Sequence, residues 1–213
     1  MEFSRQQMIE QQLRAWEVFD PRVLCAFDEL RREDFVPAAF RDVAFADMEI
    51  PLGNGARMMA PNVEGRMLDA LAPQPTDRAL EIGTGSGWVT ALLATLCADV
   101  VSYDIVPEFM SATRQKLHAA GIVNANVERR DASEFDGEGG FDVIAVTASM
   151  PVYDDRYAKL LNPGGRLFVV SGTAPVMTAR LVTRGSDGFA SRDLFETLLE
   201  PLVGLPQPSR FAL

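Results

Sequence analysis

Apolar side chains recur at helical spacing over the first 45 residues. Met8, Ile9 and Leu13 fall on one face, which predicts an amphipathic helix near the start of the chain. Asp20-Pro21 predicts a second helix, with the aspartate as N-cap and the proline at its first position. Residues 46–62 lose this periodicity and contain two glycines, two prolines and three methionines, two of which we interpret as exposed. We therefore expect an irregular loop with a functional role there.

From residue 63 onward, short apolar runs alternate with amphipathic stretches. The apolar runs predict buried strands at 79–82, 100–104, 127–131, 141–147 and 166–171. The amphipathic stretches predict helices at 63–72, 88–96, 107–120 and 153–161, the last ending at a turn over 162–165. Segments 179–183 and 189–195 have the pattern of a β-hairpin, and residues 201–213 are expected to be mostly irregular. This order predicts an α/β fold with a doubly wound, mostly parallel sheet and an antiparallel edge.

Length and composition suit one domain. The chain has 213 residues, of which 47% are apolar and 23% charged, values typical of a globular protein with a sizeable core. We interpret residues 1–62 as an N-terminal helical extension and substrate-side loop of that domain, and residues 63–213 as its core.

The charge and the reactive side chains exclude several classes of function. The formal net charge of −10 would repel nucleic acid and anionic membranes, so we expect neither as a partner. Cys25 and Cys97 lie in apolar helical contexts, and His118 is the only histidine, which argues against a metal site and a Ser-His-Asp triad. No apolar run approaches membrane-spanning length and no signal segment is present, so we expect a cytoplasmic protein.

A glycine turn follows the first predicted core strand. Gly83-Thr84-Gly85-Ser86-Gly87 stands between the strand and the helix that begins at Trp88. Such a turn lets a ligand approach the backbone closely, and the helix directs its free N–H groups towards it. Trp88 occupies the position of the third glycine of a dinucleotide-binding G-x-G-x-x-G, which disfavours a pyrophosphate. A plain tight turn without a ligand is the structural alternative.

Acidic residues end the next two predicted strands. Asp104 follows Gly83 by 21 residues, a spacing that puts it at the tip of the neighbouring strand, where it can accept both hydroxyls of a ribose. It can also cap the helix that begins at Pro107. Asp131 ends the third strand. These residues all fall at the carboxyl edge of the sheet, where ligands of such folds bind.

Taken together, these motifs resemble the protein-L-isoaspartate O-methyltransferase family over essentially the whole chain. The matching segments are Phe35-Val36-Pro37, Ala44–Asp47 followed by Ile50–Gly53, Leu80–Gly87, Phe141–Ala148, Leu161–Leu167 and the closing Arg210–Leu213. The resemblance implies a class I S-adenosylmethionine-dependent methyltransferase with a Rossmann-like, seven-stranded sheet. It implies transfer of the cofactor's methyl group to the α-carboxylate of an isoaspartyl residue, leaving S-adenosyl-L-homocysteine. The partner would be a damaged protein or peptide, and the enzyme a monomer or homodimer.

The resemblance also assigns residues to the site. Glu81 would face the methionyl amino end of the cofactor, and Asp131 would lie beside the adenine. The cofactor-binding set is Glu81, Gly83, Thr84, Gly85, Ser86, Gly87, Asp104, Ile105, Asp131, Ala132 and Thr147. The substrate-binding set is Asn54, Arg57, Met59, Val146, Thr147 and Ala148.

One segment departs from the family pattern. Where the family carries Q-T-x-S-x-P, this chain has Ala56-Arg57-Met58-Met59-Ala60-Pro61, so the hydroxyl is replaced by Met59. Arg57 either clamps a carboxylate through its planar guanidinium or points to solvent. We therefore assign no catalytic residue with certainty. Two alternatives follow from the lost hydroxyl: a different small carboxylate substrate, or a paralogue that binds S-adenosylmethionine without turnover.

Overall fold

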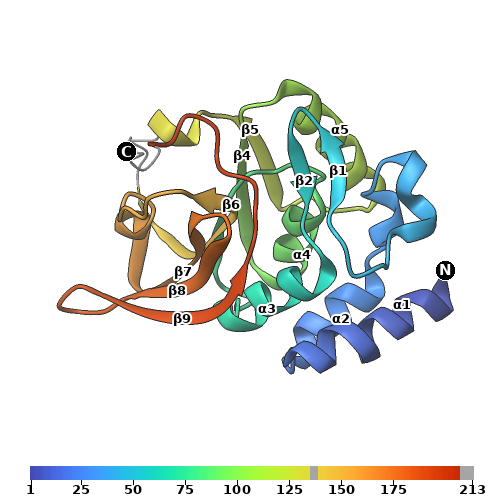
Figure 1. The fold of residues 1–213 in the computed structure, drawn as a ribbon, viewed down its shortest axis with the longest axis horizontal. Coiled ribbons are helices and arrows are strands. Elements are labelled where there is room, and N and C mark those ends of the chain that lie inside the picture. The colour runs from blue at the N-terminus through green and yellow to red at the C-terminus, as the bar shows by residue number, and fades with distance from the viewer. Residues whose placement is uncertain (135–138, 207–213) are drawn as a thin grey trace.

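A seven-stranded sheet forms the centre of the computed structural model, which describes residues 1–134 and 139–206 (Figure 1). The strands lie in the order β5-β4-β3-β6-β7-β8-β9. Their bounds are β3 Arg78–Ile82, β4 Asp99–Asp104, β5 Ala125–Arg129, β6 Phe141–Met150, β7 Leu161–Thr173, β8 Val176–Arg184 and β9 Phe189–Thr197. Only β8 runs against the other strands of this sheet. The predicted mostly parallel sheet and its C-terminal hairpin are confirmed.

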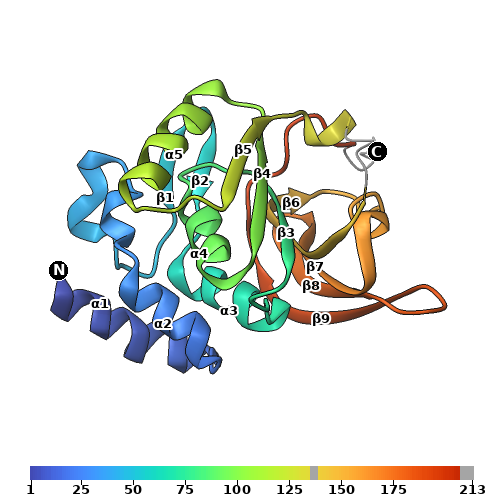
Figure 2. The same ribbon diagram turned by 180° about the vertical axis from the view of Figure 1, so that it is seen from behind.

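The α-helices gather on one side of the sheet, to the right in Figure 1 and to the left in Figure 2. They are α1 Glu2–Met8, α2 Pro21–Glu29, α3 Pro61–Leu71, α4 Trp88–Leu96 and α5 Pro107–Ala119. The chain continues from α1 through a π-helical turn (Ile9–Leu13) and a 3-10 turn (Arg14–Trp16); further 3-10 helices span Arg32–Asp34, Ala38–Val43, Ala132–Glu134 and Ala158–Leu160. Asp20 caps α2 as predicted, because its carboxylate accepts the Arg22 N–H at 2.9 Å.

Apolar residues cover both faces of the central strands. In β6, Val143 and Ala145 pack on the helical side, whereas Ile144 and Val146 belong to a second apolar cluster on the opposite face. Alternation of side chains along a strand produces this division. It explains why the predicted strands are nearly continuous apolar runs, since both of their faces are buried.

The helix predicted at 153–161 is wrong. The structure has only the 3-10 turn Ala158–Leu160 in this stretch. Asp154 accepts the backbone N–H of Arg156 at 2.9 Å, a local bond that competes with helical hydrogen bonding. The turn predicted at 162–165 lies within β7, at the point where its register against β6 shifts.

Residues 46–62 are more regular than predicted. They contain an antiparallel hairpin, β1 Ile50–Gly53 and β2 Ala56–Met58. Asn54 and Gly55 form its turn with φ of 52° and 76°. Asn-Gly between two strands is a strong hairpin signal, which the interpretation as a loop overlooked. Met58 and Met59 are each only 4% exposed, so exposure is the wrong expectation for both.

The segment after β9 returns to β6. It is irregular up to residue 206, and Ser149 of β6 forms an isolated bridge with Pro201. The closing Arg210–Leu213 motif lies outside the described residues. Over the described ranges, no helix is both long and apolar enough to span a bilayer.

Candidate active site

The glycine turn between β3 and α4 forms the floor of the site. Gly83, Gly85 and Gly87 have φ of 99°, 49° and 83°, a region that residues with a Cβ rarely adopt. A Cβ on Gly83 would lie 2.5 Å from Thr147 Oγ1, and one on Gly87 would lie 2.6 Å from the Thr113 side chain. The turn therefore requires glycine at these positions, for its conformation and for the close approach of neighbouring side chains.

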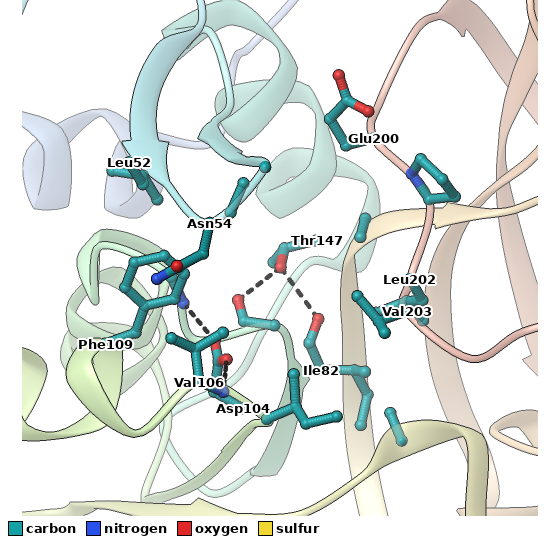
Figure 3. A pocket seen from close by; sticks show the side chains of 18 of the residues that line it. Leu52, Asn54, Ile82, Asp104, Val106, Phe109, Thr147, Glu200, Leu202 and Val203 are labelled. Atoms are coloured by element: carbon teal, nitrogen blue, oxygen red, sulfur yellow. Dashed lines mark hydrogen bonds between the residues drawn. The ribbon is translucent and has the colours of Figure 1, made fainter.

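A cavity of about 920 Å³, counted out to open solvent, lies above this turn at the carboxyl edge of the strands (Figure 3). Among the predicted cofactor residues, it is lined by Gly83, Gly85, Asp104, Ile105, Asp131, Ala132 and Thr147. Among the predicted substrate residues, it is lined by Asn54, Arg57, Thr147 and Ala148.

A second, smaller cavity adjoins the first. The two cavities share the lining residues Leu52, Arg57, Gly83, Gly85 and Thr147. The smaller one also contacts further predicted site residues, namely Met59, Glu81, Thr84 and Ser86. Gly87 and Val146 line neither cavity, since Gly87 is the N-cap of α4 and Val146 is buried in the core.

Asp104 organises the larger cavity. Its carboxylate accepts the backbone N–H of Gly85 at 2.9 Å and that of Val106 at 2.8 Å. It thereby ties the glycine turn to the segment that leads into α5 (Figure 3). On the other side, Thr147 Oγ1 donates to the Gly83 carbonyl at 2.6 Å, and the Ile82 carbonyl lies 3.0 Å away. The strand ends are held in place by backbone contacts on both sides of the turn.

Glu81 is a buried acid with one unused oxygen. The side chain is fully buried, and its Oε2 accepts hydrogen bonds of 2.5 Å from Ser102 and Thr90. Burial raises the pKa of this carboxyl to about 8. Its Oε1 has no hydrogen-bond partner among the described residues. Because buried polar atoms are normally paired, this oxygen fits a ligand donor such as the amino group of a methionyl moiety.

Arg57 and Met59 replace the family's hydroxyl segment in different ways. Arg57 Nε donates to Glu49 at 2.8 Å, and the arginine side chain is 39% exposed at the edge of both cavities. Met59 is buried in the core, and its carbonyl accepts a hydrogen bond from Arg32. The position of the missing serine therefore offers an apolar side chain to the smaller cavity.

Several lining residues were missed by sequence reasoning. They include Glu49, Leu52, Tyr103, Val106, Phe109, Arg130 and the segment 199–203. Val106 and Phe109 follow Asp104 closely, so their positions just after a strand-end acid would have indicated them. Segment 199–203 depends on three contacts with Ser149, whose N–H and Oγ donate to Glu200 and Leu199 carbonyls and whose carbonyl accepts the Leu202 N–H. No local sequence signal predicts such a long-range pairing.

The sheet order, the glycine turn after β3, the acid that ends β4 and the acid that follows β5 define a class I S-adenosylmethionine-dependent methyltransferase fold. The described ranges contain no group of three or more His, Cys, Asp or Glu side chains arranged to hold a metal ion. Residues 3–205 match the family model described as protein-L-isoaspartate(D-aspartate) O-methyltransferase (PCMT). The chain belongs to this family.

Individual relatives agree with the family model. The protein-L-isoaspartate O-methyltransferase of Myxococcus xanthus (strain DK1622) is 35% identical over 192 residues, which cover 88% of this chain and 91% of that protein. Protein-L-isoaspartate O-methyltransferase 1 of Anaeromyxobacter sp. (strain Fw109-5) is 38% identical over 189 residues, covering 87% and 89%. A Plasmodium falciparum protein assigned to the same family and solved with S-adenosyl-L-homocysteine has a TM-score of 0.80 and 18% identity, covering 93% and 97%. This last likeness shows a common fold.

Proposed function

We propose that this protein is an S-adenosylmethionine-dependent methyltransferase that methylates the α-carboxylate of isoaspartyl residues in damaged proteins or peptides. The observation that carries the proposal is the pair of adjoining cavities above the glycine turn. Strand-end acids line them, together with an arginine from the β1–β2 hairpin. Relatives named for this activity match over most of their length, which supports the choice of acceptor.

Each strand-end acid would contact a different part of the cofactor. Asp104 would accept the ribose hydroxyls, and Asp131 would lie beside the adenine. Glu81 would receive the methionyl amino group on its unpaired Oε1. When bound, the cofactor supplies a methyl group on a sulfonium, which a carboxylate can attack directly. The protein therefore needs to position and partly desolvate the acceptor, and no side chain has to remove a proton.

Arg57 holds the acceptor carboxylate. Of the described residues that line the two cavities, only Arg57 and Arg130 are basic, and Arg130 follows β5 at the adenine end. Glu49, Asp104, Asp131 and Glu200 make the rest of the larger cavity acidic, which would repel an anionic acceptor. Glu49 bonds only to Nε of Arg57, so the terminal guanidinium nitrogens remain available for a carboxylate.

A methyl-transfer assay tests the proposal. We expect labelled S-adenosylmethionine to give a base-labile methyl ester on an isoaspartyl peptide and none on its aspartyl twin. Transfer to the isoaspartyl peptide would also show that this chain works without the hydroxyl that Met59 replaces. Absence of transfer, together with tight calorimetric binding of S-adenosyl-L-homocysteine, would refute the acceptor and leave the cofactor assignment standing.

Met59 favours one second candidate. Its buried apolar side chain occupies the position of the family's serine, and a changed acceptor wall suits a different small carboxylate. Formation of S-adenosyl-L-homocysteine with small carboxylic acids, and none with isoaspartyl peptide, would select this function. No formation with either acceptor would indicate a binding protein without turnover.

A further inference from the structure

The smaller cavity contains a second buried acid, Glu64 of α3. It faces the same space as Glu81, and its side chain is 1% exposed. Glu64 was absent from the predicted site because it lies in an amphipathic helix, where an acid is usually a surface residue.

One oxygen of Glu64 is fully used by its neighbours. Oε2 pairs with the Arg32 guanidinium and accepts the indole N–H of Trp88 at 3.0 Å. Arg32 is itself completely buried, and it donates to the carbonyls of Ala44 at 2.8 Å and Met59 at 2.9 Å. The carboxylate is therefore fixed in orientation by a residue of the N-terminal extension and a residue of the core.

The other oxygen of Glu64 has no partner. Glu64 Oε1 and Glu81 Oε1 are both buried and unpaired within the described residues, and both side chains line one small cavity. Leaving a buried carboxylate oxygen unsatisfied costs free energy, so each of these atoms requires a donor. Arg32 balances the charge of Glu64, whereas no described basic side chain contacts Glu81. A ligand group with several N–H donors and one positive charge would satisfy both oxygens, and its charge would favour the ionised form of Glu81.

We propose that Glu64 is a cofactor-binding residue that, together with Glu81, forms a two-carboxylate clamp for the α-ammonium group of the cofactor. This inference rests on the proposed function, which places the cofactor-binding site above the glycine turn. An ammonium group has three N–H donors and no acceptor, which matches two acceptor oxygens whose side chains line one small cavity. The clamp connects Arg32, and through it the N-terminal extension, to cofactor binding.

Calorimetry with two ligands tests the clamp. The ligands are S-adenosyl-L-homocysteine and its analogue without the α-amino group, measured against the wild type and Glu64→Gln. We expect the variant to lose about tenfold or more in affinity for S-adenosyl-L-homocysteine, the worth of a hydrogen bond to a charged group. Affinity for the deaminated analogue should stay unchanged, because that ligand makes no contact that depends on the charge of Glu64.

Equal losses for both ligands, or no loss for either, would overturn the proposal, since Glu64 would then be structural or uninvolved. Asp104→Ala is the control for the cofactor-binding site and should lower the affinity for both ligands alike. If Asp104→Ala leaves both affinities unchanged, the proposed binding site is wrong. If Asp104→Ala lowers them and Glu64→Gln leaves them unchanged, only the clamp is refuted. Glu64→Asp keeps the charge opposite Arg32 but withdraws the oxygen, so it gives the same test should Glu64→Gln fold poorly.

Discussion

At the scale of single residues, the site combines buried acids with one exposed base. Glu81 and Glu64 are held by neighbours inside the protein, whereas Arg57 extends from a hairpin at the edge of the cavity. These two settings have different consequences. Substitution of a buried acid should alter both stability and cofactor binding, and substitution of Arg57 should alter only the use of the acceptor.

We expect Arg57→Ala to raise KM for an isoaspartyl peptide and lower kcat/KM about 10- to 100-fold, the worth of a charge-assisted bond to the acceptor. The calorimetric Kd of S-adenosyl-L-homocysteine should not change. Arg180→Ala is a matched control, because Arg180 is a comparably exposed arginine in an ion pair with Asp193 at 2.7 Å, outside the cavities. An unchanged KM in Arg57→Ala would show that this arginine points to solvent.

The pH dependence of stability should identify Glu81. Burial raises its folded-state pKa to about 8 from an ordinary value of 4.5. Between these pH values the unfolded chain has released the proton and the folded chain has kept it, so stability falls as pH rises. Glu81→Gln removes this contribution. Urea unfolding should therefore show the variant gaining stability relative to the wild type from pH 5 to pH 8, and a constant difference would contradict the shift.

At the scale of elements, the sequence predicted those parts of the fold that depend on local pattern. The strands that begin near Ala79, Val100 and Phe141 and the helix at Trp88 are apolar runs between clear turn signals, and all are confirmed. The helix predicted at 153–161 does not form, because side chains such as Asp154 bond to the nearby backbone. The prediction missed the hairpin at 50–58 because it treats Asn54-Gly55 as part of an irregular loop, although Asn-Gly between two strands is a typical hairpin turn.

The candidate site was predictable only where a motif lies on consecutive residues or at the end of a predicted strand. The glycine turn met the first condition, and the two acids were predictable because each ends a predicted strand; the structure brings Gly83, Gly85, Asp104 and Asp131 to one cavity. The acid Glu64 and the segment 199–203 reach the site through packing between distant elements. Their side chains have no periodic or spacing signal that distinguishes them from ordinary helix and loop residues.

The returning C-terminal segment gives a prediction at this scale. Ser149 Oγ donates to the buried carbonyl of Leu199 at 2.8 Å. Ser149→Ala leaves that carbonyl unpaired, so we expect a loss of about 1–3 kcal/mol in unfolding free energy. S-adenosyl-L-homocysteine should also dissociate faster, since Leu199 lines the larger cavity. Ser111→Ala, which removes an exposed bond to the Glu108 carbonyl, is the control and should change neither quantity.

At the scale of the whole molecule, one buried ion pair joins the N-terminal extension to the methyltransferase core. Arg32 lies in the extension, and its guanidinium contacts Glu64 of α3 and lies 5.5 Å from the ring of Trp88 at the start of α4. Its other bonds hold the backbone on either side of the β1–β2 hairpin, at Ala44 and Met59. The hairpin that presents Arg57 is thus anchored by the same side chain that orients Glu64.

Arg32→Met should therefore destabilise the protein by about 3–5 kcal/mol, because it leaves a buried acid without its partner. The double variant Arg32→Met with Glu64→Leu should recover part of this loss, since it removes the unpaired charge as well. Arg31→Met is the control: it substitutes the adjacent arginine, which is exposed and pairs with Glu33 and Asp34. Chemical denaturation measures all three variants. If Arg32→Met were as mild as Arg31→Met, the other contacts of the extension would be sufficient to hold it on the core. Cofactor affinity in Arg32→Met would then match the wild type instead of falling with the loss of a fixed Glu64.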